Sequence, residues 1–105
     1  MGIVADIVGF WLRHDEEGLA SWLVDDAEWD LVIGSVSGGD GDIPWPPAEA
    51  DSAELLSIVT HGRLAACDGY LVREGVRTDF SHFLRFAGTT KTAKVAAIRT
   101  YLATP

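Results

Sequence analysis

The stretch DFSHFLRFAG, residues 79–88, decides the fold that we expect for this chain. Side chains of a β-strand alternate between its two faces, and here one face is apolar except for a single histidine: Phe80, His82, Leu84 and Phe86. The opposite face carries Asp79, Ser81 and Arg85. The pattern predicts a strand that packs one side on a core and holds a titratable ring among apolar neighbours.

The segments just before this stretch also have the composition of a sheet. Residues 55–66 form one long apolar run, in which we expect Gly62 to form a β-bulge. Residues 70–73 form a second run, and Glu74-Gly75 is expected to turn the chain into the strand that ends at residue 86. The second half of the chain is therefore predicted to be mainly strands.

The first half opens with helices. Residues 3–12 are apolar along one broad side of a 3.6-residue period, and a second, shorter helix is expected to end at residues 25–26. Residues 28–33 then alternate with a period of two and predict a half-buried strand. Glycines and prolines fill residues 34–47, which we expect to be a loop or a lid, and a short helical piece is expected over residues 48–53.

Length and charge exclude several classes of protein. The 105 residues suit one domain, which we expect over residues 1–105, and 16 acidic against 8 basic side chains give a formal net charge of -8. An acidic domain with dispersed bases repels phosphate backbones, so we expect no binding to nucleic acid. No apolar stretch has the length of a membrane span, so we expect no membrane partner. The single Cys67 suits the reducing cytoplasm, where we place the protein.

Short motifs spread over the chain carry a family resemblance. In the second half they are THGR at residues 60–63, DG at 68–69, the stretch at 79–88 and IRTYL at 98–102, and in the first half LVDDAEW at 23–29. Together they resemble the nuclear transport factor 2-like superfamily, and most of all its small bacterial SnoaL-like proteins. The likeness covers nearly the whole chain, but such degenerate motifs identify a fold far better than an activity.

The resemblance implies the fold class α+β, with a cone-shaped, curved antiparallel sheet packed on N-terminal helices, a pocket at the wide end and commonly a homodimer. It also implies that residues 92–102 form a strand. The alanines and the spacing of Val95, Ile98 and Leu102 favour a helix there on propensity alone. Strand pairing regularly overrides propensity, so we expect a strand. We expect a homodimer to form through the outer face of the sheet.

His82 is the first candidate for chemistry, because a titratable ring in an apolar pocket can act as a general acid, a general base or a hydrogen-bond donor. By register it falls where ketosteroid-isomerase-like members carry the protonated acid of their oxyanion hole. The rest of that site is absent, since the position of the base reads Leu31 and the first helix offers Phe10 and Trp11 in place of a tyrosine. The alternative is a core histidine satisfied by a backbone carbonyl or a tyrosine.

Asp30 and His61 are the candidates to assist His82. Asp30 points to the face opposite Leu31. A bulge at the glycine after His61 would swing that ring inward, and the alternative is a surface position at a strand end. The catalytic residues of the limonene-epoxide-hydrolase branch, two aspartates and one arginine, are absent. Their positions in this sequence hold Ala65, Cys67 and Thr100.

A small apolar ligand is the expected partner of the pocket, and the residues expected to line it are Phe10, Trp29, Leu31, Trp45, Phe80 and Leu84. Aromatic residues at core spacing are more often simply core. Trp45 lies between two prolines, so we expect it to roof the pocket or to contact the partner copy. We expect no cofactor and no metal, because two histidines make a poor zinc site and Asp40-Gly41-Asp42 lacks the further ligands of a calcium loop.

Two functions are consistent with these residues. The first is an isomerase or cyclase that acts on a small apolar carbonyl compound and uses His82. The second is a non-catalytic module that binds a small molecule or dimerises. A third candidate, a protein-interaction module, would need an exposed apolar patch beyond the dimer face. The first function requires His82 to line a cavity, whereas a filled interior favours the second. The sequence leaves open whether the chain is an enzyme.

Overall fold

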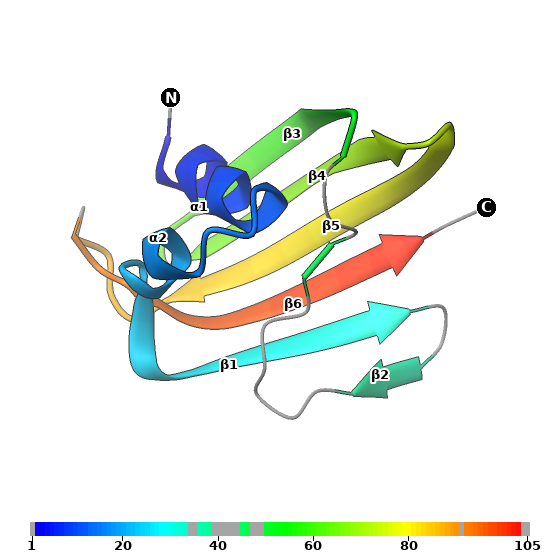
Figure 1. The fold of residues 1–105 in the computed structure, drawn as a ribbon. Coiled ribbons are helices and arrows are strands. Elements are labelled where there is room, and N and C mark those ends of the chain that lie inside the picture. Colours follow the sequence, from blue (N-terminus) through cyan, green and yellow to red (C-terminus); the bar gives the residue numbers. More distant parts are fainter. Residues whose placement is uncertain (1, 34–35, 39–44, 47–49, 91, 104–105) are drawn as a thin grey trace.

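The computed structural model describes residues 2–33, 36–38, 45–46, 50–90 and 92–103, and in it two N-terminal helices lie on one face of a curved sheet (Figure 1). The helices and strands in chain order are α1 (Ile3–Leu12), α2 (Glu16–Ala20), β1 (Leu23–Ile33), β2 (Val36–Gly38), β3 (Ser52–His61), β4 (Leu64–Arg73), β5 (Val76–Phe86) and β6 (Val95–Ala103). This arrangement confirms the expected α+β class. Within these residues, no helix has both the length and the apolar character needed to cross a membrane.

α1 forms because its apolar residues share one side, and it buries Val4, Ile7, Val8 and Trp11 against the sheet. It ends in a Schellman turn, in which the N–H of His14 bonds to the carbonyl of Trp11 and the N–H of Asp15 bonds to that of Phe10. His14 adopts φ 57°, the left-handed conformation that this turn requires. The helix therefore stops at a turn that most proteins give to glycine.

α2 begins where the side chain of Asp15 accepts a hydrogen bond of 2.9 Å from the N–H of Gly18. The expectation that this helix reaches residues 25–26 is wrong, because it ends at Ala20 and β1 begins at Leu23. The carbonyl of Trp22 accepts a hydrogen bond from the N–H of Val95 on β6. Sheet pairing with a distant strand thus overrides the helical spacing of these residues.

The strand order across the sheet is β2-β1-β6-β5-β4-β3. All neighbours pair antiparallel except β1 and β6, which run parallel. Residues 95–103 are therefore a strand, as the resemblance implied and propensity opposed. β6 lies between β5 and β1 and joins the two halves of the chain.

Gly62 does not form the expected bulge. It adopts φ 61° in a turn with Arg63, and His61 pairs with Leu64 across this turn. The apolar run at residues 55–66 is consequently two strands, and the irregularity of β3 lies between Leu55 and Ser57. The turn at Glu74-Gly75 is confirmed, with φ values of 51° and 79° that match a tight hairpin.

Parts of the expected loop and lid at residues 34–47 lie outside the described residues, as does the Asp40-Gly41-Asp42 segment. The described part of that loop includes β2, a short strand that pairs with β1 and that the glycine-rich sequence did not predict. The helical piece expected at residues 48–53 is wrong at its end, since Ser52 and Ala53 open β3. Residues 48–49 lie outside the described part.

The sheet has an inner face, under the helices, and an outer face. The core lies between the inner face and α1, and its buried members are Val4, Ile7, Val8, Trp11, Leu19, Trp29, Ala65, Cys67, Phe80, Leu84, Val95 and Ile98. Cross-strand register places Cys67, His82 and Thr100 side by side in one inner row. The row beside it on the outer face holds Ala66, Phe83 and Arg99.

Candidate functional site

His82 lies at the middle of β5 on the inner face, as the alternation of residues 79–86 predicts, and only 3% of it is exposed. Its ring stands perpendicular to that of Trp11, with 4.3 Å between the ring centroids. Phe80 lies 5.4 Å away and Trp29 lies 6.5 Å away, measured in the same way. The imidazole is therefore enclosed by aromatic rings from α1, β1 and β5.

One buried hydroxyl joins His82 to the neighbouring strands. The indole Nε1 of Trp29 donates a hydrogen bond of 2.6 Å to Oγ1 of Thr100, and that oxygen lies 2.8 Å from Nδ1 of His82. An indole can only donate, so Oγ1 of Thr100 accepts from Trp29 and its own proton is available for Nδ1 in the tautomer of His82 that carries the ring proton on Nε2. Among the described residues, Nε2 has no hydrogen-bond partner although it is buried.

Burial lowers the pKa of His82 from 6.5 to about 3, because a charged imidazolium loses its hydration in this apolar surrounding. The ring is thus neutral near pH 7. A neutral imidazole can donate a hydrogen bond from Nε2 but is a very weak base. Of the roles expected for His82, hydrogen-bond donation is the one that this electrostatic environment favours.

The space in front of His82 is filled by side chains. Trp11 is 1% exposed and contacts Phe80 edge to face at 5.2 Å between centroids. Three cavities of about 470, 240 and 230 Å³ are lined by described residues, and His82 is not among their walls. Trp11 therefore covers the imidazole from the side of α1.

The residues expected to line a ligand pocket have separate surroundings. Trp29, Phe80 and Leu84 are at most 5% exposed and belong to the core. Leu31 is half-buried on β1, and Phe10 is half-buried beneath the guanidinium of Arg13, 5.4 Å from its ring centroid. Phe80 also borders a cavity of about 470 Å³. The role of all these residues as ligand contacts stays a prediction.

Trp45 packs against the edge of the core and stacks on His14, with 5.0 Å between ring centroids and 18° between planes. Nε2 of His14 lies 2.7 Å from the carbonyl oxygen of Pro46 and donates to it. His14 is exposed, and this hydrogen bond joins the segment to the turn between the helices. Trp45 thus covers one end of the core, and its role as a pocket roof or a dimer contact stays a prediction.

The structure does not bring Asp30 or His61 to His82. Asp30 is exposed on the outer face, where it pairs in register with Arg99. His61 is exposed at the end of β3, and its register with Leu64 places it on the outer face. No bulge turns it inward, because the glycine after it is used for the hairpin. Catalytic assistance by either residue would need a different arrangement of the sheet.

Cys67 and other candidate ligands add no reactive centre. Burial raises the pKa of the Cys67 thiol to about 11, so it is protonated near neutral pH and is a weak nucleophile. Among the described residues, no three His, Cys, Asp or Glu side chains gather closely enough to hold a metal ion.

Sequence reasoning missed Thr100 as the partner of His82, and it missed the contact of the buried Trp11 with the same ring. Thr100 carried a usable signal, because it is the one hydroxyl on the apolar face of β6, between Ile98 and Leu102. Trp11 carried none beyond its place on the buried side of a helix. Which strand it would meet depends on tertiary packing.

The sequence matches no family model and no curated protein. Solved structures do match it. An NTF-2-like protein of unknown function from Burkholderia xenovorans LB400 aligns with a TM-score of 0.68 and 14% identity, over 97% of this chain and 80% of that one. A DUF4783 family protein from Bacteroides uniformis ATCC 8492 aligns with a TM-score of 0.61 and 13% identity, over 95% and 96% of the two chains.

A second NTF-2-like protein of unknown function, from Silicibacter pomeroyi DSS-3, aligns with a TM-score of 0.51 and 15% identity, over 94% of this chain and 88% of that one. Identities this low show a shared fold and leave the SnoaL-like subtype as a prediction. The helices on the inner face, the strand order and these alignments together establish that the chain has an NTF-2-like fold.

Proposed function

We propose that this protein is a non-catalytic module that forms a homodimer through the outer face of its sheet. The observation that carries the proposal is the exposure of large apolar side chains on that face: Val59 at 64%, Phe83 at 44%, Leu64 at 41% and Tyr101 at 40%. Apolar side chains of this size that gather on one face mark an interaction surface. Phe83 lies at the centre, between Ala66 of β4 and Arg99 of β6.

Charge favours a second copy of the chain as the occupant. The whole protein carries -8, but the outer face mixes both signs, with Arg85 and Arg99 close to Glu28 and Asp30 around one hollow of about 230 Å³. A two-fold interface places the same patch on both sides, so a face that carries both signs can pair its acids with the partner's bases. Elsewhere the acidic surfaces of two copies repel each other.

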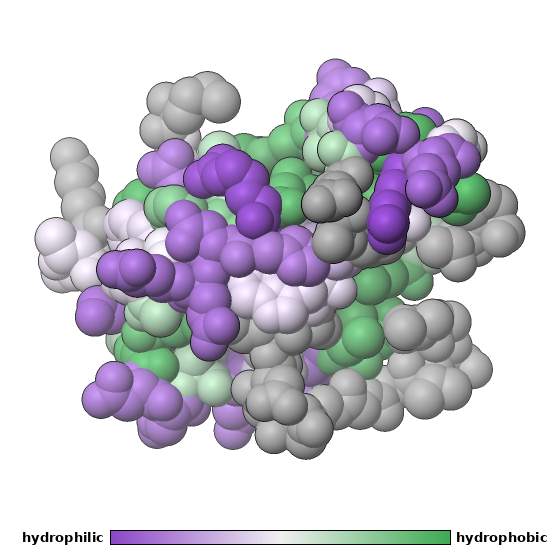
Figure 2. Space-filling model, viewed as in Figure 1, coloured by the Kyte–Doolittle hydropathy of each residue, from purple (hydrophilic) through white to green (hydrophobic). Residues whose placement is uncertain are grey.

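The shape of the outer face also suits a partner. Beside the hollow at Phe83 lies a second one of about 470 Å³, between Tyr101, Arg77, Asp79 and Leu56. The helix-bearing face differs, since hydrophilic side chains cover much of its centre (Figure 2). A partner that brings its own Phe83 against these hollows would bury the apolar side chains of both copies.

The test is the oligomeric state of the protein and of a matched pair of variants. Phe83→Asp introduces a charge at the centre of the face, while Val76→Asp introduces the same charge at an exposed valine that opens β5. Sedimentation equilibrium at about 50 μM should give a dimer for the parent and for Val76→Asp, and a monomer for Phe83→Asp. A monomeric parent, or a Phe83→Asp variant that dimerises as well as the parent, would refute the proposal.

A second candidate is the isomerase or cyclase, and the unpartnered Nε2 of His82 is the observation in its favour. A neutral imidazole that donates one hydrogen bond can stabilise an enolate oxygen. The probe is 3-cyclohexen-1-one, whose isomerisation moves a proton from C2 to C4 and yields the conjugated 2-enone. Acceleration by the parent that is lost in His82→Leu, which removes the donor, would support this candidate. Equal rates with and without protein would leave the non-catalytic module.

A further inference from the structure

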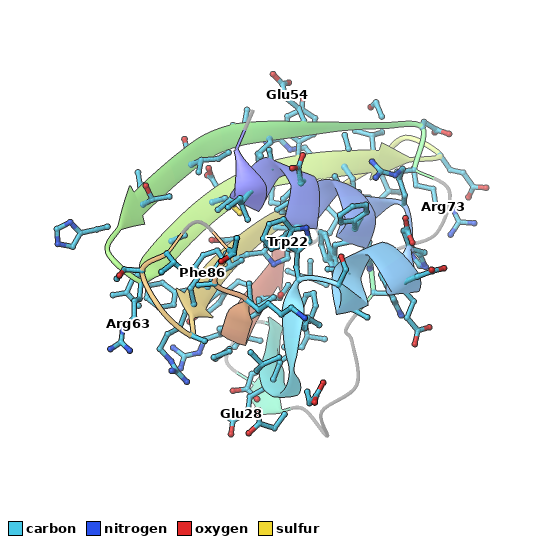
Figure 3. The ribbon with its side chains drawn as sticks, turned by 90° about the vertical axis from the view of Figure 1, so that its left-hand side faces the viewer. Trp22, Glu28, Glu54, Arg63, Arg73 and Phe86 are labelled. Atoms are coloured by element: carbon cyan, nitrogen blue, oxygen red, sulfur yellow. The ribbon has the colours of Figure 1, made fainter. Side chains whose placement is uncertain are left out.

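We propose that a pocket beside the amino end of α1 binds a small, uncharged, mostly apolar molecule that carries one hydroxyl or carbonyl group. This site is distinct from the outer face and uses none of the residues expected to line a ligand pocket. It lies where the start of α1, the end of β3 and the connection between β5 and β6 meet. Figure 3 looks onto this end of the molecule, with Phe86 below the helix and Arg63 pointing outward.

The pocket exists because α1 leaves part of the inner face uncovered. Ile58 belongs to the same inner row as Cys67 and His82, which are 4% and 3% exposed, yet Ile58 itself is 41% exposed. A large aliphatic side chain on the inner face normally packs under a helix. Here it borders a cavity of about 240 Å³ instead.

The chemistry of the walls defines the class of ligand. The lining side chains are uncharged: Ile3, Val4, Ile58, Phe86 and Ala93 supply the apolar surface, and Thr60, Thr89 and Thr90 supply hydroxyls. Three glycines, Gly2, Gly62 and Gly88, complete the wall with backbone alone. Among the described residues, no charged side chain lines the pocket, so a carboxylate or an ammonium would give up part of its hydration without an ionic partner from them, which favours a neutral molecule. One polar group on that molecule can hydrogen-bond to a threonine.

The volume limits the size of the ligand. A cavity of about 150 Å³ holds benzene, so about 240 Å³ suits one ring with a short substituent, or about ten non-hydrogen atoms. A molecule of this size binds a well-formed site with a dissociation constant of about a millimolar. The probe 2-phenylethanol has this size, and phenylacetate is its charged counterpart.

The experiment is a titration of ¹⁵N-labelled protein with each probe, followed by amide chemical shifts. We expect 2-phenylethanol to shift the resonances of Val4, Ile58 and Phe86 at millimolar concentration, and phenylacetate to bind at least ten times more weakly. The variant Ala93→Phe places a ring in the cavity and should abolish these shifts. The matched control Thr92→Phe adds the same ring at the neighbouring exposed residue, which does not line the cavity, and should keep them.

Several outcomes would overturn the proposal. They are the absence of shifts in the parent, shifts that map away from the pocket, shifts that survive Ala93→Phe, and tighter binding of phenylacetate, which would overturn the assignment of a neutral ligand. The titration is repeated on Phe83→Asp, where the same shifts are expected because the outer face takes no part. Failure of the dimer proposal and failure of this one are therefore separable.

Discussion

The hydroxyl of Thr100 should be worth more to the stability of this protein than its size suggests. It is fully buried and is the shared partner of the Trp29 indole N–H and of Nδ1 of His82. Thr100→Val keeps the shape of the side chain and removes the oxygen. Two buried polar atoms are then left without a partner, because valine offers neither a donor nor an acceptor.

The expected loss of stability follows from the two buried polar atoms that lose their partner. An unsatisfied buried donor or acceptor costs about 1–3 kcal/mol, and burial of a methyl in place of a hydroxyl returns about 1 kcal/mol. The variant should therefore lose about 1–5 kcal/mol of unfolding free energy, with a midpoint of about 3 kcal/mol. For a domain of this length, the midpoint loss lowers Tm by at least about 10 °C.

Urea unfolding at pH 7 and 25 °C, followed by far-UV circular dichroism, measures this loss. Thr100→Ser keeps the hydroxyl and loses a methyl, so it should cost only about 1 kcal/mol, and Thr92→Val at an exposed site should stay within about 0.5 kcal/mol of the parent. Trp29→Phe should cost less in the Thr100→Val background than in the parent, since its donor has already lost its acceptor. If Thr100→Val were as stable as Thr100→Ser, the hydroxyl would not join the two rings and the reasoning would fail.

Three further outcomes are expected. The pKa of His82 falls from 6.5 to about 3 on folding. Between these two pH values, His82 is therefore protonated in the unfolded chain and neutral in the native protein. The stability that this difference contributes is complete above pH 6.5 and is lost as the pH falls. In urea titrations, the free energy of unfolding should therefore decrease by about 2 kcal/mol between pH 7 and pH 5, and His82→Leu should lack this decrease. Cys67, with its pKa raised to about 11 by burial, should react with a thiol reagent at pH 8 at least about 100-fold more slowly than in urea. Gly69→Ala should cost about 1–3 kcal/mol in the same unfolding assay, because the added Cβ would press on the backbone oxygen of Glu54 and lie 2.8 Å from Cζ of Phe80, whereas Gly88→Ala should be nearly neutral.

The alternation of residues 79–86 predicted the two faces of β5 correctly, because side-chain direction in a strand is a local property. It placed His82 beside Phe80 and Leu84 on the inner face before any other element was known. The pairing partners were not predictable in this way. Thr100 reaches His82 only because β6 pairs with β5 in one particular register.

Local patterns failed where distant pairing decided the conformation. Trp22 and Leu23 have helical spacing, yet the chain leaves the helix there to meet β6. The polar residues 60–63 interrupt the run at residues 55–66, but Gly-Arg is not one of the strong turn signals, so the hairpin at Gly62 was not predicted. Ile58 could not be recognised as part of a pocket, because its exposure depends on how far α1 extends over the sheet.

The central place of β6 sets the order in which the sheet can be completed. β3, β4 and β5 form a meander of neighbouring hairpins, which needs only short loops to close. β1 pairs with β6, which comes much later in the chain: Trp29 and Thr100, which are hydrogen-bonded, are 71 residues apart. During synthesis, β1 therefore leaves the ribosome long before its partner does, with one edge unpaired until the last strand arrives. Folding of this protein should be slow for its size. Loss of β6 would separate β1 and β2 from β3, β4 and β5, and not merely shorten the sheet at one edge.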